Sequence, residues 1–417
     1  MQQIKVRVNQ FFGDEEISLP IPDEWVVKET EMGCKDTPPM TNEEIRNALD
    51  NTIGSLNIVE QAQSKRGKIV ITCDDLTRPT PIDRVFPFVI EQLHKAGISD
   101  NQIFILGAFG CHPPMNIDDF TRKIGEEAVA KYDCVNHNPF FNLENLGKTS
   151  WGRGTPVIVN KEFASADLRI CISGVKKHPM AGAGGGPKSV LPGVSSMDTT
   201  YYNHEVIGAH IKATHGYSEW WIKDNPLHLD MLEAARIANL NISINCVYDG
   251  SRRIIGLTAG DVDDAWKVAV KDCYEAHATK PIKKADIVLV NAYPSESISW
   301  WGAQASLREG GTAVAIHQYQ LGNQILHYRT ELMDGPWLRM AGYPKRRWPV
   351  KQAENIIVYT KRLSKRHMLS YSDKVEWKTE WDMVLSMLKE IHGKEALVVI
   401  YPCPSLQFDP ESLPLLI

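Results

Sequence analysis

The sequence lacks long hydrophobic runs, an excess of basic charge and paired cysteine motifs. No segment approaches the roughly 18 consecutive apolar residues of a membrane helix, and the start of the chain has no apolar core typical of a signal peptide. A formal net charge of −5 gives no basic surface for nucleic acid. The eight cysteines are scattered, without a Cys-x-x-Cys pair. We therefore expect a cytoplasmic protein with reduced thiols that binds neither membrane nor nucleic acid.

Short runs of β-branched residues alternate with helical patterns along the first two thirds of the chain. Strands are predicted at Lys68–Cys73, Gln102–Gly107, Leu168–Ser173 and Ile242–Val247, and a helix at about Ile82–Ala96. Strands that are separated by helices favour a largely parallel sheet. This part of the chain is therefore predicted to be an α/β domain.

A second set of strands follows a possible hinge at Lys280-Pro281. They are predicted at Ala285–Asn291, Gly311–Ile316 and Ala396–Tyr401. With 417 residues the chain is long enough for more than one buried core. We therefore predict an α/β fold with two α/β domains, residues 1–280 and residues 281–417.

The first polar cluster, Asp74-Asp75-Leu76-Thr77-Arg78-Pro79-Thr80-Pro81, comes directly after a predicted strand. Ligands of open α/β sheets bind beyond the carboxyl ends of the strands. A carboxylate here suits ribose hydroxyls, and the Arg78 guanidinium suits an anion. The alternative is a helix start, with Thr80 as N-cap and Pro81 in the first turn.

Two further clusters also follow predicted strands. One is Gly107-Ala-Phe-Gly-Cys-His112, where a lone histidine is either catalytic or structural. The other runs from Lys176-Lys177-His178 through four glycines in five positions to Pro187-Lys188-Ser189. Such a loop is typical of phosphate binding. It departs from the P-loop pattern because Pro187 replaces the last glycine and has no N–H to offer a phosphate.

His204 lies sixteen residues after Lys188, in a segment predicted to be helical. Imidazole is a common metal ligand. One histidine cannot complete a metal site, and no second histidine or cysteine stands at metal-binding spacing beside it. Any further ligands to a metal at His204 would have to come from elsewhere, for instance from a cofactor.

Together these pieces resemble the lactate racemase family, whose members use a nickel-pincer nucleotide. The matching segments are Asp75-Leu-Thr-Arg-Pro79, Gly110-Cys-His112, His178 to Gly193 with its glycines and Lys188, His204, Asn225-Pro through Ala235, and Ala259-Gly-Asp261. They occur in order over residues 60 to 265. The resemblance implies two domains with a cofactor and substrate cleft between them, the first carrying the cofactor and the second contributing to the substrate pocket.

The resemblance also implies a role for each matching residue. The cofactor, a nickel-bearing pyridinium-3,5-bisthiocarboxylic acid mononucleotide, would be joined covalently to Lys188 and contacted by Asp75, Leu76, Thr77 and Arg78. His204 would be the protein ligand to nickel. His112 and His178 would exchange the substrate's hydroxyl proton while hydride moves to and from the cofactor, an isomerase reaction for which imidazole is well suited. Cofactor-assembly proteins would be transient partners.

The second domain departs from the family pattern. Trp300 and Trp301 stand where the family has Tyr-Gln, and Gln304 stands where it has a substrate-binding lysine. Trp266 replaces a family histidine. We expect Arg78, Trp301 and Gln304 to contact the substrate, with Lys345-Arg346-Arg347 as another source of positive charge. These departures predict a substrate other than lactate.

The sequence leaves four hypotheses. The first is a racemase or epimerase of a 2-hydroxy acid. The second keeps the cofactor but acts on a sugar or polyol, because paired tryptophans suit a sugar face. The third is a phosphate-binding transferase, which predicts ATP binding without nickel. The fourth, a carrier of the cofactor without turnover, is disfavoured by the two histidines.

Overall fold

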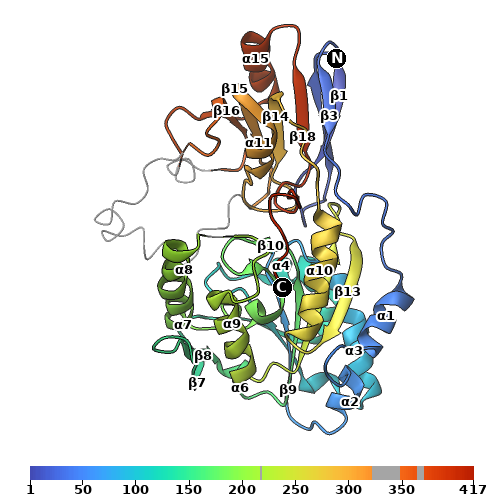
Figure 1. Cartoon of the computed structure of the whole chain (residues 1–417). Coiled ribbons are helices and arrows are strands. Elements are labelled where there is room, and N and C mark those ends of the chain that lie inside the picture. Colours follow the sequence, from blue (N-terminus) through green and yellow to red (C-terminus); the bar gives the residue numbers. More distant parts are fainter. Residues whose placement is uncertain (217, 322–347, 364–370) are drawn as a thin grey trace. The chain divides into compact units, whose positions relative to one another are not determined.

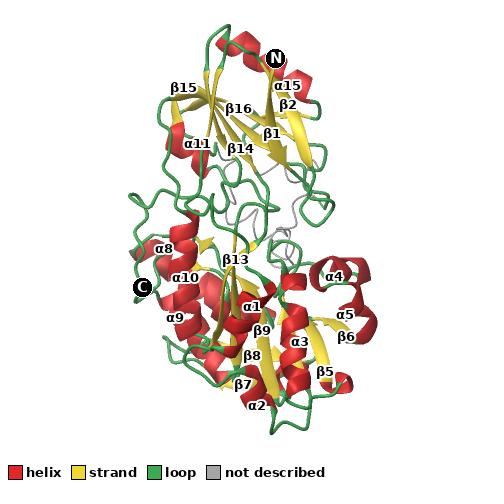
Figure 2. Cartoon of the chain, turned by 90° about the vertical axis from the view of Figure 1, so that its right-hand side faces the viewer, coloured by secondary structure: helices red, strands yellow, loops and turns green. Residues whose placement is uncertain are grey.

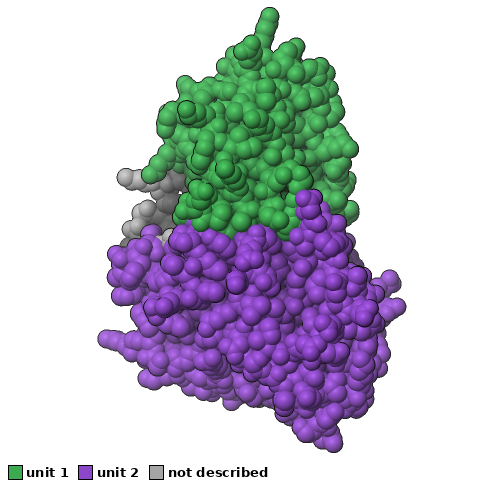
Figure 3. Space-filling model, turned by 45° about the vertical axis from the view of Figure 1, so that its right-hand side comes forward, with its two compact units in different colours: residues 1–35, 277–412 green, residues 36–276, 413–417 purple. Residues whose placement is uncertain are grey.

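The computed structural model describes residues 1–216, 218–321, 348–363 and 371–417. It divides into two compact units, coloured separately in Figure 3. Unit 1 comprises Met1–Lys35 and His277–Ser412, and unit 2 comprises Asp36–Ala276 and Leu413–Ile417. Each unit contains a six-stranded sheet with helices, which confirms the predicted α/β class with two domains (Figure 1).

The sheet of unit 2 has the strand order β13-β12-β9-β4-β5-β6. Its strands are β4 (Ile69–Cys73), β5 (Ile103–Gly107), β6 (Asp133–Asn136), β9 (Leu168–Gly174), β12 (Ile242–Tyr248) and β13 (Ile254–Gly260). All neighbours pair in parallel except β13, which is antiparallel to β12. The four strands predicted for this part of the chain are confirmed, with bounds within one residue of the expected ones.

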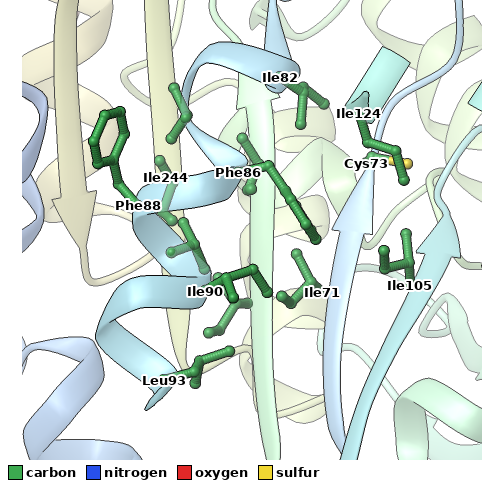
Figure 4. Packing of buried hydrophobic residues seen from close by; sticks show 14 of the residues in the cluster. Ile71, Cys73, Ile82, Phe86, Phe88, Ile90, Leu93, Ile105, Ile124 and Ile244 are labelled. Carbon is green, nitrogen blue, oxygen red and sulfur yellow. The ribbon is translucent and has the colours of Figure 1, made fainter. Parts of the chain in front are cut away.

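Helices cover this sheet on both faces (Figure 2). In β4, Ile69 and Ile71 belong to one buried cluster and Val70 belongs to the other. Successive side chains of a strand point to opposite faces, so a strand buried on both faces is apolar throughout. Figure 4 shows the first cluster, where Phe86 and Ile90 of the helix α3 (Phe86–Lys95) lie beside Ile71.

The remaining elements of unit 2 lie around this sheet. Its other helices are α1 (Asn42–Asp50), α2 (Ile58–Ala62), η1 (Ile82–Arg84), η2 (Asp100–Gln102), α4 (Ile117–Ile124), α5 (Glu126–Lys131), α6 (Lys161–Ala164), η3 (Gly186–Ser189), α7 (Met197–Tyr201), η4 (Tyr202–Ile207), α8 (Gly208–Thr214), α9 (Pro226–Ile237) and α10 (Asp264–His277). Two antiparallel pairs complete it: β7 (Leu143–Lys148) with β8 (Pro156–Asn160), and β10 (Lys177–His178) with β11 (Gly182–Ala183).

Unit 1 has a six-stranded parallel sheet of order β17-β16-β15-β14-β18-β3. Its strands are β3 (Val26–Glu29), β14 (Ala285–Asn291), β15 (Leu307–Ile316), β16 (Ala353–Tyr359), β17 (Glu376–Lys378) and β18 (Leu397–Tyr401), beside a hairpin of β1 (Gln2–Arg7) and β2 (Glu16–Ile21). Its helices include α11 (Trp301–Ser306) and α15 (Trp381–His392).

The division differs from the predicted boundary at residue 280 in the placement of residues 1–35. These residues belong to unit 1, because β3 pairs in parallel with β18 at the sheet edge. Ile4 and Val6 of β1 also share a buried cluster with Ile287. Hydrophobic periodicity predicts that a strand exists but not which distant strand it pairs with, so the sequence grouped this segment with its neighbours along the chain.

Two expectations from composition concern the whole chain. Across the described ranges, no helix has both the length and the apolar character needed to cross a membrane. The eight cysteines are free thiols, and all except Cys134 are buried. They are therefore core residues, as the scattered positions indicated.

Candidate functional site

The three polar clusters of unit 2 meet beyond the carboxyl ends of β4, β5 and β9. The backbone N–H of Gly174, at the end of β9, donates to Asp74 Oδ2 after β4 at 3.4 Å. The backbone N–H of Gly110, after β5, donates to the carbonyl of Gly193 at 2.8 Å. Parallel strands end at the same sheet edge, so segments distant in sequence are brought together there, as the sequence predicted.

An ion pair joins the first two clusters. Nδ1 of His112 lies 2.6 Å from Oδ2 of Asp75. The other carboxylate oxygen accepts from the backbone N–H of Thr77 at 2.7 Å and from the Thr77 hydroxyl. Burial alone would raise the pKa of Asp75, but His112, Arg78 and Thr77 together hold this pKa well below its usual range. Asp75 is therefore a fixed carboxylate that orients the His112 ring.

A second, deeper ion pair fixes the loop after β4. Nζ of Lys123, from α4, lies 2.5 Å from Asp74 Oδ1, and the Lys123 side chain is 0% exposed. The same ammonium donates to the carbonyl of Arg78 at 2.8 Å. The Thr80 hydroxyl donates to Asp74 at 2.7 Å, and no side chain caps η1. The structure thus does not contain the Thr80 helix cap that the sequence left open, and Thr80 instead holds the loop in shape.

The glycine-rich segment lies against a tryptophan that replaces the family histidine. Gly186 has φ +53°, and a Cβ there would lie 2.5 Å from Cδ1 of Trp266. Nε1–H of Trp266 donates to the carbonyl of Gly184 at 2.8 Å, and the indole stacks on His228 with centroids 4.5 Å apart. A side chain at position 186 therefore does not fit, and Trp266 holds the backbone on which Lys188 stands.

Lys188 lies in η3 and is partly buried. Burial lowers the pKa of its ammonium group to about 7, and the charge of Arg78 contributes in the same direction. A far larger share of the Lys188 amines is therefore neutral near pH 7 than for an ordinary lysine. A neutral amine is the nucleophilic form of lysine.

His178 stands in the short β10–β11 pair. Its Nδ1 accepts hydrogen bonds from the backbone N–H groups of Ala181 at 3.0 Å and Met180 at 3.3 Å. Burial lowers the pKa of His178 well below the usual value, and the charges of Lys188, His204, Arg78 and Lys176 lower it further. The neutral form of His178 is therefore favoured, and the charge of Arg78 in the first cluster acts on His178 in the third.

His204 lies in η4, a π-helical turn between α7 and α8. The neighbouring Asn203 is buried, and its amide donates to Asp230 Oδ2 at 2.8 Å. Asp230 also accepts from the hydroxyls of Thr149 at 2.5 Å and Thr155 at 2.8 Å. π-Helical turns are frequent at functional sites. This buried network fixes the turn that presents His204.

Comparison with known proteins decides the family. Residues 12–216 match the lactate racemase N-terminal domain. Lactate racemase of Lactiplantibacillus plantarum is 34% identical over 284 residues, which span 66% of this chain and 65% of that protein, just under two thirds of its length. Lactate racemase of Thermoanaerobacterium thermosaccharolyticum is 29% identical over 317 residues, 73% of this chain and 72% of that protein. The chain belongs to the lactate racemase family.

Solved structures support the same fold. The lactate racemase apoprotein of T. thermosaccharolyticum superposes with a TM-score of 0.68 at 21% identity, covering 98% of this chain and 100% of that one. A protein from Thermotoga maritima superposes with a TM-score of 0.63 at 16% identity, covering 89% of this chain and 98% of that one. The chain therefore has the fold of these solved structures.

Of the residues at which the sequence departs from the pattern that the resemblance implies, Trp300, Trp301 and Gln304 lie in unit 1, whereas Trp266 lies in unit 2. Trp300 is buried, and its Nε1–H donates to the Tyr371 hydroxyl at 3.3 Å, so it is a core residue. Trp301, the first residue of α11, packs edge-on against Tyr401 with centroids 5.4 Å apart. The exposed Gln304 donates to the carbonyl of Pro349 at 2.8 Å. Substrate contact by Trp301 and Gln304 stays a prediction, as does the cleft between the domains, and Lys345–Arg347 lie outside the described residues.

The side chains of the site can be compared with the needs of the nickel nucleotide that the resemblance implies. Within the described residues, no group of three or more His, Cys, Asp or Glu side chains is arranged to hold a metal ion. The site contains the imidazole of His204 on a fixed turn, the amine of Lys188 with its lowered pKa, and the guanidinium of Arg78. This donor set fits a cofactor that brings its own nickel ligands and needs one imidazole and one covalent anchor.

Sequence reasoning missed the residues that hold the site in place. Lys123 gave no signal, because a lone lysine in an amphipathic helix is normally exposed. The Thr149 and Thr155 hydroxyls that bind Asp230 lie in an ordinary polar loop. Asp230 did carry a signal, since it falls within a segment that matches the family, and Asp74 stands directly before another such segment. Lys123, Thr149 and Thr155 can be recognised as partners of buried carboxylates only once the fold is known.

Proposed function

We propose that this chain is a racemase or epimerase that inverts the hydroxyl-bearing carbon of a 2-hydroxy acid. The observation that carries the proposal is the contact of His112 with Asp75. The charge of Arg78 acts on Asp75 and also on His178 and Lys188. A racemase needs groups that move the hydroxyl proton and a cation that binds the acid. The family relatives, named as lactate racemases, support this reaction class.

The cofactor that fits this site is a nickel-pincer nucleotide. When bound, it would supply a centre that accepts hydride from the substrate carbon and gives it back. Lys188 would hold it covalently, His204 would bind its nickel, and Asp75, Leu76, Thr77 and Arg78 would form the surrounding loop. The lowered pKa of Lys188 supports the covalent role, since attachment needs the neutral amine.

The chain's own residues then act on the substrate oxygen atoms. Arg78 donates to the Thr77 hydroxyl at 2.7 Å, which holds its guanidinium beside the Asp75–His112 pair. A guanidinium fixed in this way suits a carboxylate. His112 and His178 would exchange the hydroxyl proton of the substrate.

The first test asks whether the chain carries the cofactor. Protein co-expressed with the cofactor-assembly proteins, the transient partners we expect, is analysed for nickel, for intact mass and by peptide mapping. We expect one nickel-linked mass increase located on Lys188. Nickel should be lost from His204→Ala and retained by His210→Ala, which changes an exposed histidine six residues further along the chain. An adduct on Lys176 or Lys177, or nickel retained by His204→Ala, would refute the assignment.

The second test asks which substrate is inverted. Loaded protein is incubated with lactate, malate, gluconate and a neutral sugar, and enantiomer or epimer ratios are followed. We expect a 2-hydroxy acid larger than lactate to react fastest. If the neutral sugar alone reacts, the sugar or polyol alternative replaces this proposal, and ATP binding without nickel would favour the transferase.

A further inference from the structure

His178 lies on the β10–β11 hairpin, which residues 219–225 hold in place; we call these residues the supporting segment. Within the hairpin, His178 stands opposite Gly182. The carbonyl of Gly182 accepts a hydrogen bond from the backbone N–H of Trp220 at 2.9 Å. Gly182 has φ +76°, and a Cβ there would lie 2.3 Å from the carbonyl oxygen of Trp221. The two backbones therefore approach so closely that only glycine fits at position 182.

Side chains also join the supporting segment to the hairpin. Nζ of Lys177, in β10, lies 3.3 Å from Oε2 of Glu219, and the Lys177 side chain is 4% exposed. The side-chain amide of Asn225 donates to the carbonyl of Met180, in the turn of the hairpin, at 3.0 Å. The hairpin is thus fixed to the supporting segment at its strand and at its turn. The position of His178 between these two points therefore depends on the position of that segment.

Trp220 has a backbone conformation that a tryptophan rarely adopts. Its φ is +64°, in the left-handed region that disfavours a bulky side chain. Such a conformation persists only where the surrounding structure holds it. The indole is buried and packs edge-on against Tyr274 with ring centroids 5.4 Å apart. The Tyr274 hydroxyl in turn donates to the carbonyl of Leu413 at 3.1 Å. The contacts around Trp220 therefore determine whether the supporting segment keeps its place.

Further contacts of this kind come from the segment Leu413–Ile417, which belongs to unit 2 although it follows the residues of unit 1 along the chain. The backbone N–H of Leu416 donates to the carbonyl of Trp220 at 3.1 Å. The Leu416 carbonyl accepts from the backbone N–H groups of Ile222 and Lys223, both at 2.8 Å. Main-chain hydrogen bonds thus connect Leu416 to Trp220, and Trp220 to the hairpin that carries the histidine.

We propose that Leu413–Ile417 is a positioning element for His178: by pairing with the supporting segment it holds Trp220 in its left-handed conformation and so keeps the hairpin in place. This inference rests on the proposed racemase function, in which His178 exchanges a substrate proton. Proton transfer needs its two partners within hydrogen-bond reach. A displaced hairpin therefore lowers turnover, while Lys188 and His204, which lie outside the hairpin, still hold the cofactor.

The variants that test this role change Leu416 in two ways. Proline has no N–H, so Leu416→Pro removes the hydrogen bond to Trp220. The Leu416 side chain is 47% exposed, so Leu416→Ala shortens it while the N–H stays, which makes it the matched control. Tyr274→Phe is a milder second variant, because it removes the hydroxyl that donates to Leu413 and keeps the aromatic ring.

The first experiment follows hydrogen exchange of cofactor-free protein by mass spectrometry. We expect Leu416→Pro to exchange about five- to tenfold faster than wild type in residues 219–223 and in residues 177–184, the effect of one lost hydrogen bond. Peptides of β4 and β5 should be unchanged, Tyr274→Phe should show the same pattern more weakly, and Leu416→Ala should match wild type. Unchanged exchange in residues 177–184 overturns the inference, because the effect then stops short of His178. This result needs no turnover.

The second experiment measures inversion by loaded enzyme at equal nickel content. We expect Leu416→Pro to lower kcat by roughly ten- to a hundredfold, because His178 is misplaced, and to leave KM within about twofold, because Arg78 is not. Leu416→Ala should keep both constants within about twofold of wild type. A wild-type kcat in Leu416→Pro, together with faster exchange, would show that the hairpin's position does not limit proton transfer. Absence of turnover in loaded wild type would instead refute the racemase function, and the exchange result would remain.

Discussion

Units 1 and 2 both place a histidine and a carboxylate residue beyond the strands of a six-stranded sheet, but they connect them differently. In unit 2, His112 bonds the side-chain carboxylate of Asp75 at 2.6 Å. In unit 1, Nε2 of His317 bonds the backbone carbonyl of Glu296 at 2.8 Å, and the Glu296 carboxylate accepts from the Ser295 hydroxyl at 3.1 Å. His112 thus contacts a side chain that can carry charge, whereas His317 contacts only the main chain of Glu296 in this bond.

The same contrast appears in the ion pairs. Lys123 and Asp74 of unit 2 form a pair whose side chains are 0% and 14% exposed. Arg308 and Asp286 of unit 1 form a pair whose side chains are 42% and 28% exposed. Charges in unit 2 are thus removed from water around the site, where each depends on its partner. The proposed chemistry therefore rests on residues of unit 2, and the expected substrate contacts of Trp301 and Gln304 in unit 1 stay predictions.

The largest expected effect is the loss of turnover when His112 of unit 2 is replaced. His112→Ala should lower the turnover number by roughly 10² to 10⁴, because the general base is lost. His392→Ala in unit 1, which loses only a 2.8 Å hydrogen bond to Thr312, should leave turnover within about twofold of wild type. Inversion rates are measured on preparations with equal nickel content. If both variants lost turnover equally, the proposed difference between His112 of unit 2 and His392 of unit 1 would be wrong.

The next effect concerns the amine of Lys188. Burial, and to a lesser extent the charge of Arg78, lowers the pKa of Lys188 to about 7. The fraction of the reactive neutral amine therefore rises as the pH rises through 7 and falls below it. Trace acetylation of cofactor-free protein, followed by peptide mass spectrometry from pH 5 to 9, should show a midpoint near 7 at Lys188. Arg78→Gln should move that midpoint upward because one of the two causes is removed. A midpoint above 9 in the wild type would contradict the assignment.

The free energy of unfolding gives a third comparison, between an ion pair of unit 2 and one of unit 1. Lys123→Met leaves the buried Asp74 carboxylate without its cation and should lower the free energy of unfolding by about 3–5 kcal/mol. Arg308→Ala removes an accessible pair and should cost less than about 1 kcal/mol. Urea denaturation measures both. Adding Asp74→Asn to Lys123→Met should recover part of the loss, and a Lys123→Met protein as stable as wild type would show that the pair is not needed.

These outcomes also mark how far the sequence could predict the molecule. The strands β4, β5, β9 and β12 were predictable because a parallel strand buried on both faces is an uninterrupted β-branched run. The approach of the three clusters followed from the rule that ligands bind at the carboxyl ends. The Asp75–His112 pair and the Lys123 anchor did not follow, since they depend on distances between segments that no local pattern encodes. The pairing of β3 with β18 was missed for the same reason.

The smallest expected effect is on substrate choice, and it tests the role assigned to unit 1. Gln304 stands where the family pattern has a lysine, and a charge-assisted hydrogen bond to a small carboxylate contributes roughly 1.5–3 kcal/mol. Gln304→Lys should therefore raise lactate inversion by about tenfold or somewhat more, mainly by lowering KM, with little change for a larger acid.

The matched control for this test is Gln352→Lys. Gln352 donates to the carbonyl of Gln304 at 2.8 Å, so the control adds the same charge to the same neighbourhood from a different position. If long-range attraction of the anion were sufficient, both variants would improve lactate binding and the gain would disappear at high salt. If the lysine acts by direct contact, only Gln304→Lys improves it, and most of the gain survives salt. No gain in either variant would mean that Gln304 is not in the substrate pocket and that the lactate preference of the relatives is determined elsewhere.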